Sequence, residues 1–556
     1  MKVYFKYLLA VVVITLELSC KSNDKQVDSP KPNVVLILVD DMGYSDLGAY
    51  GSEIRTPHID ALANNGVVFS EFYNVGICAP TRASLLTGQY QHDAGVGYFN
   101  INLGVPSYQG YLAENTVTIA EALKTNGYAT FLAGKWHVGS DSLYWPIQRG
   151  FDQFYGFIEG ASVYFNHLPH AEKPTPLIEN NERIVAEEED FYLTNAISQK
   201  ANDFISGNKN SGKPFFLYLA YNAPHWPLQA LPKDIAKYKG VYDIGWDSLR
   251  NLRYKKLIEN GIIKEGHSLG ERPSTIPAWN TLSADEQRTW AARMEVHAAM
   301  LDRVDQNIGK LIAHLKQNGQ YENTVFFFLS DNGAAGENVS RVFADWGQLP
   351  GPKNATELGG PDSYESITHR WAYAINTPFS YWKTFPYEGG INTPFIASFP
   401  AKWKHRKVVG RGHIIDVLPT ILELSGTAYP KQYNEKDILP AAGRSLLPVF
   451  KGKRAINHDT LYFERGGNKA VRAGKWKLLK LNGDANWRLF DMELDPAEVH
   501  DLSSREHDRV QGLINSHQDW EKNHQVLNTD SLLKAAETAK SMLKFEEGVA
   551  ETVKMN

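Results

Sequence analysis

The sequence predicts an α/β protein with a large, mostly parallel sheet sandwiched by helices and a smaller α+β subdomain at the carboxyl terminus. Short apolar runs recur without the alternation of a half-exposed strand, which is typical of strands covered on both faces. Segments with helical apolar spacing lie between these runs, as expected for a parallel sheet whose strands are joined by helices. After about residue 456, short strand-like pieces separated by turns replace this pattern.

The elements follow from these patterns in chain order. We expect strands of the sheet at the apolar runs, namely residues 33–39, 130–133, 215–220, 325–329 and 394–399. Helical spacing predicts helices over residues 116–126 and 286–317, and Gly319 lies where the second should end. A shorter helix is expected over residues 81–87. In the subdomain we expect strands at residues 460–464, 470–472, 476–480 and 487–490.

Two long polar stretches, residues 229–282 and 334–376, show little periodicity, and we expect them to be loops. Loops of this length in a compact domain are usually functional or disordered. The predicted division of the chain is a main domain over residues 32–455 and the subdomain over residues 456–556.

The composition is that of an ordinary globular protein. The chain has 556 residues, of which 43% are hydrophobic and 22% charged, and these proportions exclude a disordered chain, a fibrous protein and a polytopic membrane protein. Lys and Arg number 58 against 63 Asp and Glu, a net charge of −5. Because there is no basic excess, we expect no nucleic acid partner. The two cysteines, Cys20 and Cys78, exclude a disulfide framework.

The amino terminus resembles a bacterial lipoprotein signal. Lys2 and Lys6 precede an apolar run over residues 8–16, which is too short to span a bilayer. Cys20 and a polar stretch follow this run, whereas Glu17 departs from the usual aliphatic residue. A plain secretory signal or a membrane-tethering segment is the alternative.

This signal predicts an exported protein, held in the cell envelope on its periplasmic or surface face by a lipid on Cys20 alone. Residues 1–19 would be the signal peptide and residues 20–31 a linker. If Cys20 is acylated, Cys78 has no cysteine partner. A lone thiol in an oxidising compartment is expected to be buried, reactive or modified.

Polar side chains follow four of the predicted strands. Asp40-Asp41 follow the run at residues 33–39, and Lys135 and His137 follow the run at 130–133. Asn222 and His225 follow the run at 215–220, and Asp331-Asn332 follow the run at 325–329. Ligands of open α/β sheets bind beyond the carboxyl ends of the strands, so we expect these side chains to meet at one edge. The Asp and Asn side chains of the first and last ends offer only oxygen ligands, which suits Ca²⁺ or Mg²⁺ better than Zn²⁺. For Asp40-Asp41 alone, a helix N-cap pair is the alternative.

A cysteine stands at the start of the helix expected over residues 81–87. Pro80 fits the geometry of a helix start. Cys78 therefore faces the positive helix end, which is an anion-binding position, and Arg82 follows one turn later. The alternative is a cysteine that merely packs.

These residues lie in motifs that resemble the formylglycine-dependent sulfatases. The most specific motif is Cys78-Ala-Pro-Thr-Arg82 followed by Leu-Thr-Gly. The resemblance covers most of the chain, with further motifs in the family's order: Asp40-Asp41, Thr56-Pro-His-Ile-Asp60, Gly134-Lys-Trp-His137, Arg149-Gly-Phe-Asp152, His225, Ser330-Asp-Asn-Gly333, Tyr387-Glu-Gly-Gly390, Gly474-Lys-Trp-Lys-Leu478 and Leu489-Phe-Asp491. The chain departs from the family at Thr81, where Ser is commoner, and at Gln89 and Asn392, where Arg is common.

The resemblance implies an alkaline-phosphatase-like fold and a sulfuric ester hydrolase. A formylglycine-generating maturation enzyme would oxidise Cys78 to formylglycine, whose hydrate supplies the attacking hydroxyl and a second hydroxyl that helps to expel sulfate. One Ca²⁺ or Mg²⁺ ion would be held by Asp40, Asp41, Asp331, Asn332 and the modified Cys78.

The same resemblance implies roles for the remaining site residues. Arg82 and Lys135 are placed to hold the hydrate and the sulfate. His137 resembles the base that takes the proton of the second hydroxyl. His225 and Lys383 resemble the pair that neutralises the leaving alkoxide, since Lys383 lies four residues before Tyr387, which opens the Tyr-Glu-Gly-Gly motif.

We expect the substrate to be a sulfated polysaccharide or its oligosaccharides, with specificity carried by the two long polar stretches. His92, His167 and His369 lie where they could reach it, and His413 is expected to be structural. A phosphodiesterase or phosphonate ester hydrolase of the same fold stays open, because formylglycine phosphonate hydrolases share the cysteine motif. The third alternative is a non-catalytic surface lipoprotein that binds sulfated glycans.

Overall fold

The computed structural model describes residues 30–168, 171–339, 357–453 and 458–536. Within them the largest feature is a ten-stranded sheet in the order β12-β2-β11-β10-β1-β9-β3-β4-β7-β8. The expected signal peptide, Cys20 and most of the expected linker lie outside the described residues. No helix in the described ranges is long and apolar enough to cross a membrane.

The centre of this sheet is parallel and consists of the predicted apolar runs. Four of them lie side by side in the order β10 (Thr324–Ser330), β1 (Asn33–Val39), β9 (Phe215–Ala220) and β3 (Ala129–Lys135). Every residue of these strands is buried. The prediction of strands covered on both faces is therefore confirmed.

The outer strands are less uniform. They are β2 (Gly66–Tyr73), β11 (Phe395–Ser398) and β12 (Arg406–His413) on one side of the centre, and β4 (Gln153–Phe157), β7 (Pro176–Glu179) and β8 (Glu182–Val185) on the other. The run predicted at residues 394–399 is β11, and it runs antiparallel to both neighbours. β12 has no apolar run to reveal it, because this edge strand is rich in Arg, Lys and Gly.

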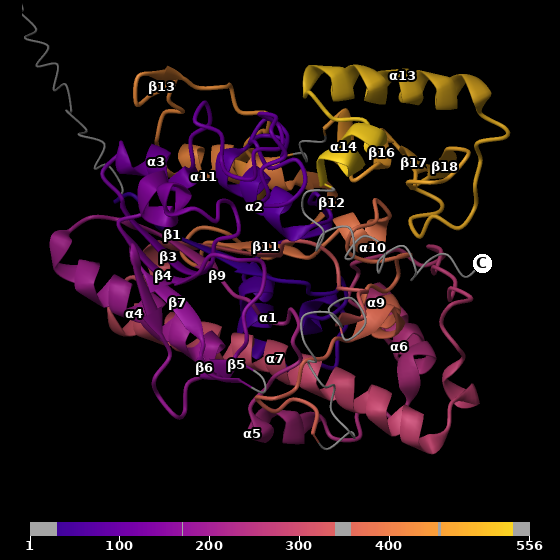
Figure 1. The fold of residues 1–556 in the computed structure, drawn as a ribbon, viewed down its shortest axis with the longest axis horizontal. Coiled ribbons are helices and arrows are strands. Elements are labelled where there is room, and N and C mark those ends of the chain that lie inside the picture. Colours follow the sequence, from indigo (N-terminus) through magenta and orange to yellow (C-terminus); the bar gives the residue numbers. More distant parts are fainter. Residues whose placement is uncertain (1–29, 169–170, 340–356, 454–457, 537–556) are drawn as a thin grey trace, which may run out of the picture.

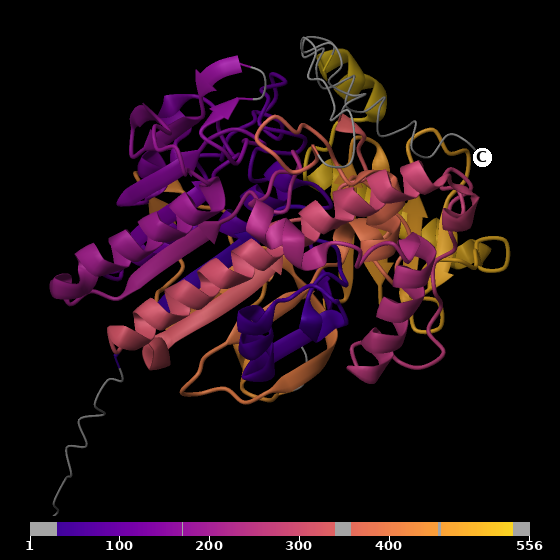
Figure 2. The same ribbon diagram turned by 90° about the horizontal axis from the view of Figure 1, so that it is seen from below.

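Alternate residues of β1 serve two separate cores. Val35, Ile37 and Val39 pack in one buried cluster, together with the apolar faces of α1 (Pro57–Asn64), α4 (Leu193–Asn208) and α7 (Ala284–Gln317). Val34, Leu36 and Leu38 pack in the other with α2 (Cys78–Thr87), α3 (Ile119–Lys124) and α11 (Val417–Ser425). Figure 1 shows these helix groups on opposite sides of the sheet, and Figure 2 shows α4 and α7 side by side.

The helix ends follow from local chemistry. The predicted helix over residues 286–317 is α7, and Ser283 and Glu286 form a reciprocal capping box at its start. Thr118 and Glu121 form the same box at α3. Gly88 ends α2 in the left-handed conformation, with φ 65°, which glycine adopts without steric cost.

The prediction that residues 229–282 form a loop is wrong in part. This stretch contains α5 (Pro232–Ile235) and the longer α6 (Gly245–Glu259). The inward face of α6 carries Arg250 and Arg253, both buried, so its apolar periodicity is interrupted. Arg250 donates to backbone carbonyls through its terminal nitrogens, and Arg253 donates to the side chains that follow β1. The second stretch likewise contains α9 (Thr368–Ile375).

The carboxyl-terminal residues form a separate four-stranded antiparallel sheet, as predicted, with α13 (His507–Asn523) above it in Figure 1. Its strands are β15 (Thr460–Arg465), β16 (Asn468–Ala473), β17 (Trp476–Lys480) and β18 (Arg488–Asp491). The described residues end in α14 (Thr529–Ala536). The smaller elements are α10 (Glu388–Ile391), α12 (Leu447–Phe450), β5 (His167–Leu168), β6 (Ala171–Pro174), β13 (Gln432–Tyr433) and β14 (Lys436–Asp437).

A buried charge cluster joins this sheet to α10. Lys477 of β17 lies 2.8 Å from Glu388 Oε1, at the start of α10, and 2.6 Å from Glu498 Oε1. The Lys477 side chain is 0% exposed. Burial, opposed by Lys477 and reinforced by Glu388, raises the pKa of Glu498 to about 8. The Glu498 carboxyl group is therefore mostly protonated at neutral pH.

We expect Lys477→Ala to lower the free energy of unfolding by about 3–5 kcal/mol, because it leaves Glu388 buried without its counter-charge. Lys475→Ala is the matched control: Lys475 pairs with Asp491 at 2.5 Å, but its side chain is 42% exposed. That change should cost about 0–1 kcal/mol. Denaturant unfolding of both variants measures the difference, and equal losses would contradict a structural role for the buried cluster.

Candidate active site

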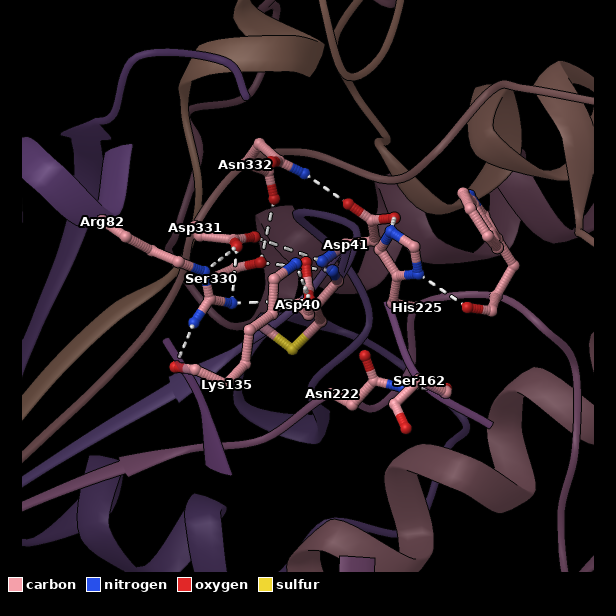
Figure 3. Close-up of polar contacts among 12 residues, drawn as sticks. Asp40, Asp41, Arg82, Lys135, Ser162, Asn222, His225, Ser330, Asp331 and Asn332 are labelled. Carbon is pink, nitrogen blue, oxygen red and sulfur yellow. Dashed lines mark hydrogen bonds and ion pairs between the residues drawn. The ribbon is translucent and has the colours of Figure 1, made fainter. Parts of the chain in front are cut away.

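The polar residues at the carboxyl ends of the central strands converge, as the sequence predicts. Asp40 and Asp41 follow β1, Asp331 and Asn332 follow β10, and Lys135 is the last residue of β3. Figure 3 shows these side chains, Arg82 from α2 and His225 from the loop after β9, pointing toward one another. All of them are buried.

The oxygen groups of this cluster are held close together. Asn332 Nδ2 donates to Asp41 Oδ1 at 2.6 Å, and the Asp41 N–H donates to Asp331 Oδ1 at 3.4 Å. One ligand atom each of Asp40, Asp41 and His225 lie within 4.8 Å of one another, a spacing that could hold a metal ion. In the described part of the chain, the buried Asp40 Oδ1 and Asn332 Oδ1 accept no hydrogen bond.

Two cationic side chains occupy the other carboxylate oxygens. Arg82 donates from Nε and Nη2 to Asp331 Oδ2, at 3.1 and 2.7 Å, and its Nη2 also lies 3.4 Å from Asp40 Oδ2. Lys135 Nζ lies 2.6 Å from the same Asp40 oxygen. The paired oxygens are thus satisfied by the protein, and the unpaired ones stay available to a ligand.

A third cation, Lys383, comes from the loop before α10. Its Nζ lies 2.8 Å from Asp41 Oδ1. Burial lowers the pKa of Lys383, but Asp41 and Glu337 together raise it by more. The pKa therefore lies well above the usual range. This lysine is charged at neutral pH.

Cys78 is the first residue of α2 and is 4% exposed. Burial raises the pKa of its thiol; Lys135 and Lys383 oppose this effect, and Asp40 and Asp331 reinforce it. The unmodified group is therefore a neutral thiol at neutral pH, and a thiol is a poor nucleophile.

Two histidines complete the cluster. Burial lowers the pKa of His137, and the cations Lys135, Arg82 and Lys383 lower it further, so the ring is neutral. Within the described residues its buried Nδ1 has no hydrogen-bond partner.

The second histidine, His225, faces the carboxylates. Its Nδ1 lies 2.6 Å from the carbonyl oxygen of Trp226 and therefore carries a proton, whereas its Nε2 faces Asp41 Oδ2 at 3.4 Å. Burial lowers the pKa of His225, and Asp41 opposes this effect. In its neutral form the Nε2 lone pair would face a carboxylate, which is unfavourable unless a cation or a proton lies between them.

Left-handed backbone conformations gather around this cluster. Asp41 and His137 have φ 66° and 62°, and Tyr381 and Thr384, on either side of Lys383, have φ 60° and 79°. Such conformations cost about 1–3 kcal/mol each for residues other than glycine, and they persist where the surroundings impose them. The fold therefore fixes the directions of these side chains at a cost in stability.

Comparison with known proteins identifies the family. The sulfatase family matches residues 32–427. The chain belongs to the sulfatase family. A second family, described as the C-terminal part of N-sulphoglucosamine sulphohydrolase, matches residues 379–522. The protein is therefore a sulfuric ester hydrolase of the alkaline phosphatase superfamily.

Individual relatives of the chain are sulfatases as well. The sulfatase is 33% identical to an uncharacterized sulfatase of Schizosaccharomyces pombe, over 88% of this chain and 93% of the relative. It is 34% identical to an arylsulfatase of Klebsiella aerogenes, over 76% of this chain and 93% of that relative. Among solved structures, Ps i-CgsB in complex with k-i-k-neocarrahexaose superposes with a TM-score of 0.66 at 27% identity, covering 91% of this chain and 100% of that one.

The three residues that depart from the family motifs each make hydrogen bonds with their surroundings. Thr81 Oγ1 accepts from the Val75 N–H at 3.1 Å, a bond that Ser would also make. Gln89 Nε2 donates to the carbonyls of Leu439 and Pro440. Asn392 accepts from the Phe72 N–H and donates to Glu388, so it supports the start of α10.

The other histidines of the sulfatase differ in position. His92 is buried with its Nε2 3.0 Å from Glu464 of β15, so it links the loop after α2 to the carboxyl-terminal sheet. His413 accepts from the Ile415 N–H and is structural, as expected. His167 is partly exposed, 3.7 Å from Asp362. His369 is half-buried, and this burial lowers its pKa to about 4.

Sequence reasoning missed Glu337, a buried carboxylate 3.7 Å from Lys383. It lies five residues after Asn332 in a segment with no recognisable motif. Its burial is the signal that identifies it, and burial cannot be inferred from an isolated Glu in a polar stretch.

Proposed function

We propose that this sulfatase hydrolyses sulfate esters of a sulfated polysaccharide or its oligosaccharides, using a formylglycine derived from Cys78 and one Ca²⁺ or Mg²⁺ ion. The observation that supports this most strongly is the setting of Cys78. It lies among carboxylates and cations that suit a sulfate group and a metal, yet burial keeps its thiol protonated. Such a cysteine is useful to a sulfatase only after its conversion to another nucleophile.

The available donors fit the two groups. Formylglycine would supply, as its hydrate, one hydroxyl that attacks sulfur and a second that lets the sulfate leave without a separate water. The divalent cation would lower the pKa of the attacking hydroxyl and draw charge from the sulfate oxygens. Asp40, Asp41, Asp331 and Asn332 would hold it, since each presents oxygen and two of these oxygens are unpaired in the described structure.

The chain's own residues then bind and move protons. Arg82, fixed by Asp331, and Lys135, fixed by Asp40, keep two positive charges beside Cys78 and orient the sulfate. His137 is neutral and its Nδ1 is unpaired within the described residues, so it can take the proton of the second hydroxyl.

Charge balance favours a monoanionic group. Four buried carboxylates, including Glu337, face three buried cations in this site. A divalent cation turns this excess of one negative charge into an excess of one positive charge, which matches a sulfate monoester. A phosphate monoester carries nearly two negative charges at neutral pH, so the balance suits it less well.

A phosphonate ester is also a monoanion, so charge balance does not exclude the second candidate. A panel of matched nitrophenyl sulfate, phosphate and phenylphosphonate esters separates the two functions. We expect kcat/KM to be highest on the sulfate ester. A higher value on the phosphonate would replace the proposed function with phosphonate ester hydrolysis.

His225 and Lys383 are proposed to neutralise the leaving alkoxide. Lys383 is charged at neutral pH. His225 is neutral in the described state, but a bound sulfate adds a negative charge beside it and favours protonation of Nε2. A sugar alkoxide is a poor leaving group and needs this proton, whereas a nitrophenolate barely does.

We therefore expect His225→Ala to lower kcat/KM on a sugar sulfate by about 10²–10⁴-fold and on nitrophenyl sulfate far less. Lys383→Ala should lower both, because this lysine also holds sulfate charge. Steady-state kinetics on the two esters measure the contrast. Equal losses for His225→Ala would assign this residue to sulfate or metal binding instead.

The relative solved with k-i-k-neocarrahexaose and the family match to a sulphohydrolase of a sulfated sugar support a carbohydrate substrate. A screen of defined sulfated oligosaccharides, with inorganic sulfate as the readout, identifies the glycan. Hydrolysis confined to small aryl sulfates would contradict the proposal.

We also propose export, a lipid on Cys20 as the membrane anchor, and maturation by a formylglycine-generating enzyme. The lipoprotein-like amino terminus supports the first two proposals, and Cys78 supports the third. Cell fractionation tests the anchor: a Cys20→Ala chain that remains in the membrane fraction would contradict it.

A further inference from the structure

Glu337 is a buried carboxylate that contributes charge to the site but has no assigned role in the steps of the proposed reaction. Its side chain is 2% exposed, and within the described residues neither of its oxygens accepts a hydrogen bond. Burying a charge without hydrogen bonds is costly, so a native protein retains such a group where it has a task. The cation near it is Lys383, whose Nζ lies 3.7 Å from Glu337 Oε1.

The backbone fixes Glu337 beside this lysine. The Lys383 N–H donates to the Ala334 carbonyl at 3.0 Å, which fastens the segment before Glu337 to the segment that carries Lys383. Gly336 packs directly on Trp382: a Cβ at Gly336 would lie 2.1 Å from the indole ring. These two contacts fix the two segments relative to each other. The fold therefore holds the Glu337 carboxylate near the Lys383 ammonium.

Lys383 and the proposed divalent cation compete for one carboxylate. Lys383 Nζ lies 2.8 Å from Asp41 Oδ1, closer than it lies to Glu337. A divalent cation held by Asp41 repels the ammonium and occupies the same oxygens. The ammonium then needs another counter-charge, and Glu337 is within reach. Lys135 is the contrasting case, since among the described residues it pairs with Asp40 alone.

We propose that Glu337 is a positioning residue that takes over Lys383 from Asp41 when the divalent cation binds. The inference rests on the proposed cation site. Glu337 lowers the cost of cation binding, because the displaced ammonium keeps a counter-ion. It also holds the lysine next to the metal carboxylates, where its charge can act on the sulfate and the leaving oxygen.

A double-mutant cycle with cation affinity as the readout tests this inference. Calorimetric titration of the full chain with Ca²⁺, and separately with Mg²⁺, gives the Kd for the wild type, Glu337→Gln, Lys383→Met and the double variant. We expect Glu337→Gln to raise the Kd by roughly tenfold when Lys383 is present, and by no more than about twofold in the Lys383→Met background. Lys383→Met alone should lower the Kd.

Two controls separate this coupling from general damage. Glu365→Gln removes another buried carboxylate, one that pairs with Arg293 at 2.8 Å, and should leave the Kd unchanged. The melting temperature of the metal-free variants reports folding. If Glu337→Gln is unstable, Glu337→Asp keeps the charge at a longer distance and should give an intermediate Kd.

The outcomes distinguish the two levels of the proposal. An equal rise in Kd in both Lys383 backgrounds would show that Glu337 acts on the cation by charge alone, and an unchanged Kd would show that it does not act at all. Either result overturns the inference and leaves the cation site standing. A wild-type chain that binds neither Ca²⁺ nor Mg²⁺ would overturn both.

Discussion

Cys78→Ser is expected to leave a folded protein whose steady turnover of sulfate esters falls by on the order of 10⁴–10⁶-fold, the scale on which loss of a nucleophile acts. A serine hydroxyl can attack sulfur, but the resulting sulfate ester has no second hydroxyl on the same carbon to expel the sulfate. The variant should therefore release at most one leaving group per chain. Rapid-quench kinetics with a nitrophenyl sulfate measure this burst against the later steady rate.

Cys78→Ala is the matched control for this prediction. It lacks any nucleophile at the start of α2 and should give neither a burst nor turnover. Circular dichroism should show the same fold for both variants, because Ser and Ala are no larger than Cys and both are compatible with a helical residue. Steady turnover by Cys78→Ser at the wild-type rate would contradict the formylglycine mechanism.

Asp331→Ala is expected to abolish divalent cation binding and activity together. Asp331 supplies one of the few charged ligands of the proposed site, and it also fixes Arg82 through two hydrogen bonds. Asp331→Asn, which keeps the shape of the side chain, separates the loss of charge from a packing defect and should lose the cation as well. Elemental analysis checks the metal content, and two zinc ions per chain would contradict a single Ca²⁺ or Mg²⁺ site.

The same residue predicts a pH dependence. Burial, reinforced by Asp40 and opposed by Arg82, raises the pKa of Asp331 to about 6. Below that pH the carboxyl group is protonated and a proton competes with the cation, so the Kd for Ca²⁺ should rise as the pH falls through 6. Titrations at several pH values measure this, and a Kd that stays constant down to pH 5 would contradict it.

The central sheet and most of the site could be predicted from the sequence, because each depends on strong local signals. The unalternating run of β1 requires cover on both faces, and residues at the carboxyl ends of neighbouring parallel strands must meet. Asp40 and Asp331 were therefore predictable from the pattern alone. Lys383 was not, since the loop that carries it shows no periodicity, and only its place before the Glu-Gly-Gly motif of the family indicated it.

Other features depend on long-range packing that a single sequence does not display. The sequence predicts a loop where α6 lies, because Arg250 and Arg253 interrupt the apolar spacing of its buried face. In the sequence, Glu337 resembles any polar loop residue. Its burial depends on the packing of Gly336 on Trp382, a contact between distant segments. In each case a charged side chain is buried because distant segments satisfy it or surround it.

The central claim is that Cys78 is converted to the nucleophile of a sulfate ester hydrolase, and the most direct test is mass spectrometry of the peptide that contains Cys78. The chain would be expressed with and without a formylglycine-generating enzyme, and release of inorganic sulfate from a sulfated oligosaccharide measured in the same samples. We predict an aldehyde at Cys78 in the active sample and activity in proportion to the fraction converted. Full activity from a chain whose Cys78 is entirely an unmodified thiol would contradict the account.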